Sequence, residues 1–244
     1  MPVAKLKRSQ SSRAYMASAA KRRKLTIAQR RGMAVPGYTR SVGNYRRFGP
    51  GGELKFHDVD IDDAVISAAG TILNGGTINV IQQGVTESQR VGRKCTIRNL
   101  HWRYNVRLTE QAADTSPPAS DVVRVILYVD RQANGAAATT TDILEEDNWQ
   151  SFRNLANSGR FSIMYDKTHT LNQTAMTING ADNFNTNEVF REAQFHKTCM
   201  VPIEYSGTTG ALGEIRSNNF GVLLLSINGV CSFDSKLRMR FSDN

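Results

Sequence analysis

The sequence predicts an all-β fold, a single antiparallel eight-stranded jelly-roll sandwich that follows a disordered basic N-terminal arm. Apolar residues recur with a period of two from about residue 53 onward, which is typical of half-buried strands. Clusters of Gly and Asn separate these runs by loops of uneven length, and no motif repeats at a fixed period. This uneven spacing favours a sandwich and disfavours a propeller or a solenoid.

The clearest predicted strand spans residues 96–108, whose two faces differ in polarity. One face carries Leu100, Trp102, Tyr104, Val106 and Leu108. The other face carries Asn99, His101, Arg103, Asn105 and Arg107. Residues 122–129 and 220–227 are instead apolar on both faces, apart from Arg124, and therefore predict strands that are covered on both sides.

Shorter strands are expected elsewhere in the body. They are predicted at residues 54–59, 78–81, 161–165, 190–198, 200–205 and 236–241. Only residues 141–155 contain a pattern that fits one or two helical turns.

Charge divides the chain into two predicted domains, a basic arm over residues 1–52 and a jelly-roll domain over residues 53–244. The first 50 residues hold 13 of the 31 Lys and Arg residues and no acidic residue. The rest of the chain carries 18 cations against all 22 acids, a net charge of −4. The arm has too little apolar surface to offset its ordering entropy, and residues 49–52 (GPGG) form a hinge. This split predicts a polyanionic partner for the arm and excludes a uniformly basic body.

Cysteine usage and hydropathy indicate the compartment. Cys95, Cys199 and Cys231 fit neither a disulfide framework nor a paired zinc motif, so a reducing compartment is expected. The apolar runs are much shorter than the roughly 20 residues of a membrane-spanning helix, and the basic N-terminus lacks the apolar stretch of a secretory signal. We therefore expect a protein of the cytosol or nucleus without membrane insertion.

The arm carries the strongest functional signal, because cations that contact phosphates release counterions and bind nucleic acid without reading its sequence. Aromatic residues lie among the cations, where they can stack on unpaired bases. The predicted nucleic-acid-binding residues of the arm are Lys5, Lys7, Arg8, Arg13, Lys21, Arg22, Arg23, Lys24, Arg30, Arg31, Arg40, Arg46 and Arg47. Four of them, Lys21, Arg22, Arg23 and Lys24, have the composition of a nuclear import signal. The alternative is a tail that only solubilises or targets the protein.

Three cations of the body, Arg98, Arg103 and Arg107, are predicted to extend this interface if their strand lines a concave surface. Arg103 and Arg107 share the polar strand face with His101, and a merely solvated face is an equal alternative. Residues 236–240 repeat the pattern with Lys236, Arg238 and Arg240. For this second set an edge strand that uses cations to block aggregation is the favoured interpretation.

The search for catalytic and metal sites is negative. The sequence has no phosphate-binding loop, dinucleotide fingerprint, nucleophile elbow or metalloprotease motif. Residues 58–63 (DVDIDD) resemble a calcium loop but lack its glycine and its terminal glutamate. His196 and Cys199 have the spacing of zinc ligands without a second pair. We therefore expect no catalytic residue, no metal and no cofactor, and an enzyme is disfavoured.

Three segments of the body carry a family resemblance by their order and spacing. They are residues 82–94 (QQGVTESQRVGRK), 124–132 (RVILYVDRQ) and 160–167 (RFSIMYDK). Behind a basic arm, they resemble the capsid proteins of small circular single-stranded DNA viruses that encode a replication initiator, the geminivirus, nanovirus and circovirus-like group. The resemblance covers roughly two-thirds of the chain, and the chain departs from the geminiviral pattern by lacking a Cys/His zinc set.

This resemblance implies a jelly-roll capsid domain that self-assembles into an icosahedral shell, with about 60 copies in the smallest closed case. It also implies an arm on the single-stranded DNA genome, location in the virion, and import into the host nucleus by an import receptor. Two rivals stay open. One is the capsid protein of a small RNA virus, because nothing in the sequence reads a 2′-hydroxyl. The other is a non-viral nucleic-acid-binding β-domain with a basic tail.

Overall fold

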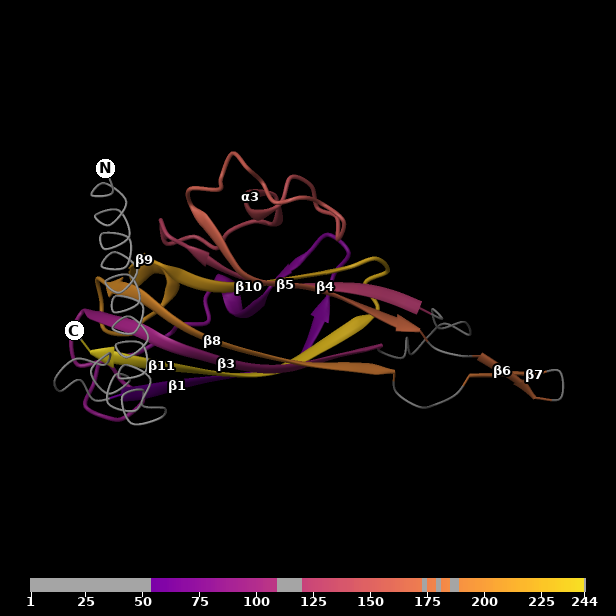
Figure 1. The fold of residues 1–244 in the computed structure, drawn as a ribbon, viewed down its shortest axis with the longest axis horizontal. Helices are drawn as coiled ribbons and strands as arrows, with labels where there is room; N and C mark the ends of the chain where they lie inside the picture. Colours follow the sequence, from indigo (N-terminus) through magenta and orange to yellow (C-terminus); the bar gives the residue numbers. More distant parts are fainter. Residues whose placement is uncertain (1–53, 109–119, 173–174, 179–180, 185–188, 244) are drawn as a thin grey trace, which may run out of the picture. The chain divides into compact units, whose positions relative to one another are not determined.

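A computed structural model describes residues 54–108, 120–172, 175–178, 181–184 and 189–243 (Figure 1). These residues form two antiparallel sheets, stacked face to face, and a separate two-stranded hairpin. No helix among them is both long enough and apolar enough to span a membrane. The predicted arm lies outside the described residues.

The larger sheet has five strands in the order β1-β11-β3-β8-β9. Its strands are β1 (Leu54–Ile66), β3 (Lys94–Leu108), β8 (Phe190–Tyr205), β9 (Ile215–Ser217) and β11 (Cys231–Asp243). The smaller sheet has the order β2-β10-β4-β5. Its strands are β2 (Thr71–Ile72), β4 (Ser120–Asp130), β5 (Phe161–Asn172) and β10 (Asn219–Ser226). The remaining elements are β6 (Ala175–Ile178), β7 (Ala181–Phe184), the short helix α3 (Thr140–Ile143) and the 3-10 turns η1 (Leu73–Gly76) and η2 (Leu212–Glu214).

The strands pair in a nested order. β1 pairs with β11, β2 with β10, β3 with β8 and β4 with β5, always antiparallel. Successive pairs alternate between the two sheets, so the chain is an antiparallel ribbon of four strand pairs rolled into a sandwich. This is the jelly-roll topology with eight principal strands. The predicted fold class is therefore confirmed.

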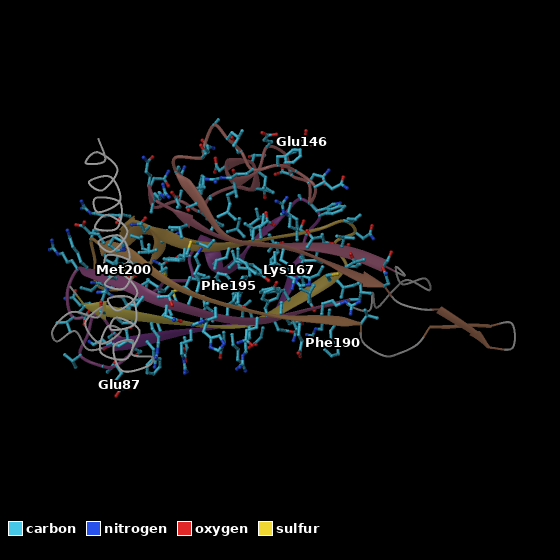
Figure 2. The ribbon with its side chains drawn as sticks, viewed as in Figure 1. Glu87, Glu146, Lys167, Phe190, Phe195 and Met200 are labelled. Carbon is cyan, nitrogen blue, oxygen red and sulfur yellow. The ribbon has the colours of Figure 1, made fainter. Side chains whose placement is uncertain are left out.

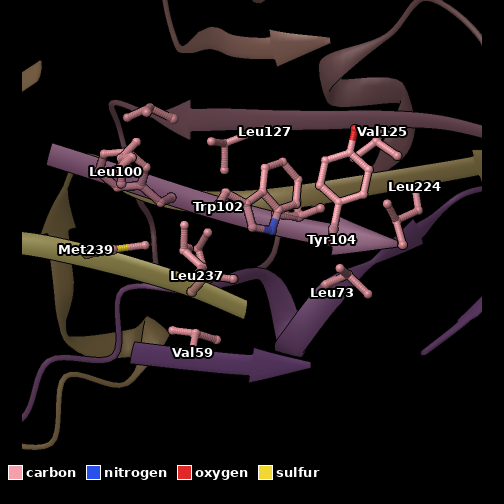
Figure 3. Close-up of a cluster of buried hydrophobic side chains, with 14 of the residues drawn as sticks. Val59, Leu73, Leu100, Trp102, Tyr104, Val125, Leu127, Leu224, Leu237 and Met239 are labelled. Atoms are coloured by element: carbon pink, nitrogen blue, oxygen red, sulfur yellow. The ribbon is translucent and has the colours of Figure 1, made fainter. Parts of the chain in front are cut away.

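The main core lies between the sheets (Figure 3). Trp102 and Tyr104 of β3 point inward with Leu100 and pack with side chains of the opposite sheet, among them Val125 and Leu127. Because side chains alternate along a strand, a slip of one residue would move this whole apolar row to the outside. The amphipathic pattern predicted for residues 96–108 is thus what fixes the register of β3.

A second core covers the outer face of the smaller sheet. The chain between β4 and β5, which includes α3, lies over that face (Figure 1). The residues of this core are Ile126, Tyr128, Ala138, Ile143, Leu144, Phe161, Leu223 and Leu225. At Gly221, opposite Tyr128, an added Cβ would lie 2.4 Å from the tyrosine ring, so glycine makes room for it. The two strands predicted to be apolar on both faces are therefore covered on both sides by this chain's own residues.

Residues 78–81, predicted as a strand, form none. Ile78 and Ile81 are fully buried, and the Ile78 N–H donates to the Phe220 carbonyl at 2.9 Å, but this bond does not extend into a strand ladder. The Asn79 carbonyl accepts a hydrogen bond from Tyr205 Oη at 2.8 Å, and its side-chain oxygen accepts one from the backbone N–H of Phe220 at 2.9 Å. The apolar pattern therefore predicted the burial of these residues correctly, but the predicted strand conformation was wrong.

Three other expectations change in detail. The two strands predicted at residues 190–198 and 200–205 are the single strand β8, because a bulge sets Cys199 and Met200 of β8 against Arg98 of β3 and the pairing continues on either side. The helical pattern at residues 141–155 yields only α3, which begins at a capping box formed by Thr139 and Asp142. Finally, β11 lies between β1 and β3, so the edge-strand interpretation of Lys236, Arg238 and Arg240 is wrong.

Candidate nucleic-acid interface

The predicted interface falls into two parts. The thirteen arm cations and the import signal lie outside the described residues, so they stay sequence-based expectations. The three cations of the body, Arg98, Arg103 and Arg107, all lie on β3, the central strand of the larger sheet.

The outer face of the larger sheet is a polar surface on which acids from β1 face cations from β11. The register places Asp58 beside Arg238 and Asp60 beside Lys236. Arg238 donates two hydrogen bonds to Asp58, Nε to Oδ1 at 2.7 Å and Nη2 to Oδ2 at 2.6 Å. Lys236 Nζ lies 3.4 Å from Asp60 Oδ2. Neighbouring strands thus neutralise each other's charges across this face.

The contact between Asp58 and Arg238 shifts the pKa values of both side chains. The hydrogen bond from Arg238 holds the pKa of the Asp58 carboxyl below its usual range, and burial opposes that effect. The same contact raises the pKa of Arg238. Both groups are well exposed, so the pair organises the surface and adds little to stability.

The three predicted body cations differ in how they are held. Arg107 bridges two acids, with Nη2 at 2.9 Å from Asp63 Oδ1 and Nε at 3.6 Å from Asp234 Oδ2. Arg98 donates from Nε to Ser242 Oγ at 2.9 Å. Arg103 is exposed, stands between Lys236 and Gln194 in the register, and has no ion pair among the described residues. Of the three, Arg103 alone combines exposure with an unneutralised charge.

Arg103 also lines a shallow groove on this face. The groove is formed by residues of β1, β3, β8 and β11, including Asp62, Asn105, Glu192, Asp234 and Lys236. Acids and cations both contribute, so the groove is not uniformly positive. This mixture makes the outer face a weak candidate for a phosphate backbone.

A second group of cations was missed by the sequence reasoning. Lys167 lies on β5, and Arg191 and Lys197 lie on β8, at the side of the sandwich where these two strands contact each other. We call this side the lateral seam. Lys167 and Phe195 on these strands are labelled in Figure 2. The cations occupy the same alternating rows as the inward-facing Tyr165 and Phe195, and this period-two placement is the signal that could have found them.

The two patterns that resemble metal sites are not assembled. Residues 58–63 lie within β1, where Asp58 and Asp60 pair with cations and Asp63 accepts from Arg107. His196 and Cys199 are three residues apart on one strand and so point to opposite faces. Within the described part of the chain, no group of three or more His, Cys, Asp or Glu side chains is placed to hold a metal ion.

The fold and surface define a jelly-roll β-sandwich with paired acids and cations on the outer face of the larger sheet and a covered outer face on the smaller sheet. No protein-family model matches the chain. The chain is similar to the coat protein of Maize white line mosaic Satellite virus, with 26% identity over 182 residues, which cover 71% of this chain and 76% of that protein. This similarity to a coat protein supports a viral capsid function.

Solved structures add no further argument. The 60-mer BFDV capsid protein shares 9% identity over 80% of this chain and 93% of its own, with a TM-score of 0.29. The structure of infectious bursal disease virus Gt strain shares 12% identity over 79% of this chain and 42% of its own, with a TM-score of 0.15. Such low TM-scores bear on neither the fold nor the function of this chain.

Proposed function

We propose that this chain is the capsid protein of a small single-stranded DNA virus, that it self-assembles into an icosahedral shell, and that its basic arm packages the genome. The observation that carries the proposal is the separation of charge, with 13 cations and no acid in the first 50 residues and a net charge of −4 on the rest. A nearly neutral body can pack beside copies of itself, while the genome neutralises the arm.

The quantities are consistent with packaging. About 60 arms of 13 cations supply roughly 780 positive charges, the order needed to offset much of a kilobase-scale strand. The similarity to a coat protein and the jelly-roll topology support the shell-forming role of residues 53–244. On the body, Arg103 is the best placed of the three predicted contacts, because Arg98 and Arg107 already bond within the sheet.

The import signal belongs to the same proposal. Lys21, Arg22, Arg23 and Lys24 would bind a host import receptor and bring the protein to the nucleus, where a single-stranded DNA genome is replicated and packaged. Replacing these four residues with Gln in a full-length fluorescent fusion should abolish nuclear accumulation. Unchanged accumulation would assign the four cations to phosphate contact alone.

The test of the main proposal is to express the full chain, purify it and image it by negative-stain electron microscopy. We expect uniform spherical shells. When the shells assemble in an equal mixture of single-stranded DNA and RNA, the nucleic acid that they enclose should be mainly DNA. Shells that select RNA would transfer the assignment to a small RNA virus. A monomer or dimer that persists across salt and pH would overturn the capsid function and favour a nucleic-acid-binding β-domain.

A further inference from the structure

The lateral seam differs from the outer sheet face in how its cations are balanced. On the outer face, Arg238, Lys236 and Arg107 each have an acidic partner. At the seam, Lys167, Arg191 and Lys197 form no ion pair with any acid of the described residues. The fold therefore leaves three positive charges unpaired at one side of the sandwich, whereas on the neighbouring face it pairs Arg107, Lys236 and Arg238 with acids.

The seam cations reach across the gap between the two sheets. Arg191 donates from Nε to the Thr170 carbonyl at 3.3 Å, and Lys197 Nζ lies 3.8 Å from Met164 Sδ. Each contact joins β8 to β5 and leaves charge that these neutral partners do not cancel. At about 3.3 Å per residue, Arg191 and Lys197 stand roughly 20 Å apart along β8. The charges thus form a row and not a point.

Aromatic residues lie within the same row. The rings of Phe195 and Tyr165 meet across the seam at a centroid distance of 4.8 Å, between the contacts of Arg191 and Lys197. Phe195 is half-buried, so part of its ring remains accessible. Cations alternating with an accessible ring are the arrangement by which proteins hold a single strand, through phosphate contacts and base stacking.

The seam cations also affect the pKa of the buried His169. Its pKa is lowered by burial and, in addition, by repulsion from Lys167 and Arg191. Two seam cations therefore act on the same small region, and no acid is among the causes of the shift in the His169 pKa. A row of like charge around that region is suited to a ligand whose own negative charges repeat along its length.

We propose that the lateral seam binds the sugar-phosphate backbone of single-stranded nucleic acid, as a second contact site on the body beside the arm. The proposal rests on the packaging function proposed above. The presence of Phe195 in the row favours nucleic acid over an acidic segment of a second copy, since a peptide carboxylate would not use a stacking surface.

The test uses the full chain with Lys167, Arg191 and Lys197 all replaced by Gln. Binding of a fluorescein-labelled thirty-nucleotide oligo-dT is followed by anisotropy across a salt series. The slope of log K against log salt is negative, and each lost phosphate contact makes it shallower by about 0.7, so the slope of the variant should be shallower by about 2. A control variant with Arg93, Arg131 and Arg216 replaced by Gln, all exposed and off the seam, should keep the wild-type slope.

A charge-conserving variant, with Lys167→Arg, Arg191→Lys and Lys197→Arg, separates charge from folding and should also keep the wild-type slope. An unchanged slope in a folded Gln variant overturns the seam site. If the slope is unchanged but the Gln variant forms no particles in electron micrographs, the seam does not bind nucleic acid and instead contacts a second copy of the chain. If the wild-type chain itself does not bind the oligonucleotide, it is the packaging function that fails.

Discussion

Arg124 and Asp166 are joined by two hydrogen bonds across the paired strands β4 and β5, Nε to Oδ1 at 2.8 Å and Nη2 to Oδ2 at 2.6 Å. The remaining nitrogen, Nη1, donates to the carbonyls of Trp149 at 3.0 Å and Ser151 at 2.6 Å. A single guanidinium therefore ties the edge strand β5 to the segment that covers the smaller sheet. This explains why a charged residue interrupts an otherwise apolar strand.

Replacing Arg124 with Met should lower the free energy of unfolding by about 2 kcal/mol, because bonds to an ionised group are lost and two carbonyls and a carboxylate are left without their donor. Urea unfolding monitored by circular dichroism measures the change. Arg216→Met, at an exposed position, should shift stability by less than about 0.5 kcal/mol. Equal effects of the two substitutions would contradict the role given to Arg124.

The second core predicts that α3 contributes to stability although it has only four residues. Ile143 is fully buried against the smaller sheet, so Ile143→Ala should cost about 2–4 kcal/mol through lost burial and a cavity. Phe152→Ala, in the same covering segment, removes a larger side chain that is 79% exposed and should be nearly neutral. Thermal unfolding of both variants decides the matter, and a small effect at Ile143 would mean that the segment is only loosely attached.

The stability of the body should fall as the pH falls below about 6.5, the ordinary pKa of histidine. Burial, with repulsion from Lys167 and Arg191, lowers the pKa of His169 in the folded state. The unfolded chain therefore binds the proton more tightly, and stability that is complete above pH 6.5 is lost on acidification towards the folded pKa.

Denaturant unfolding at pH 8 and pH 5.5 measures this effect, with His169→Gln as the comparison. Glutamine can still bond to Tyr104, whose hydroxyl lies 2.8 Å from His169 Nε2, but it does not titrate. The wild-type chain should lose more stability than the variant between the two pH values. The pKa of His57 is also lowered by burial, so His57 contributes to the pH dependence of stability in both the wild-type chain and the His169→Gln variant. Identical losses would show that His169 does not contribute.

Much of the fold could be predicted because period-two patterns report burial directly. The row from Leu100 to Val106 fixed the face of β3, and the two-sided apolar runs indicated that the smaller sheet would be covered. The strand predicted at residues 78–81 was wrong because burial alone does not distinguish a strand from an irregular segment held by Asn79. Local patterns cannot show which polar side chain will replace a strand ladder.

The site was less predictable, because neutralisation depends on pairing between distant strands. Arg107 looks like a free cation in the sequence, yet it meets Asp63, 44 residues away, and Asp234, 127 residues away. Lys236 and Arg238 appeared to mark an edge strand, but they lie on the inner strand β11 and face acids of the edge strand β1. The period-two rows of β5 and β8 mark the seam cations one strand at a time, but the sequence does not show that the two rows lie side by side in the rolled ribbon.

Deletion of residues 1–47 tests the central claim most directly. The full chain and the deleted chain are purified side by side as assembled particles, and the ratio of absorbance at 260 and 280 nm is measured after nuclease treatment. The deleted chain should keep the circular dichroism spectrum and unfolding midpoint of its β-sandwich and lose most of its protected nucleic acid, because 13 of its cations are gone. An unchanged ratio would contradict packaging by the arm.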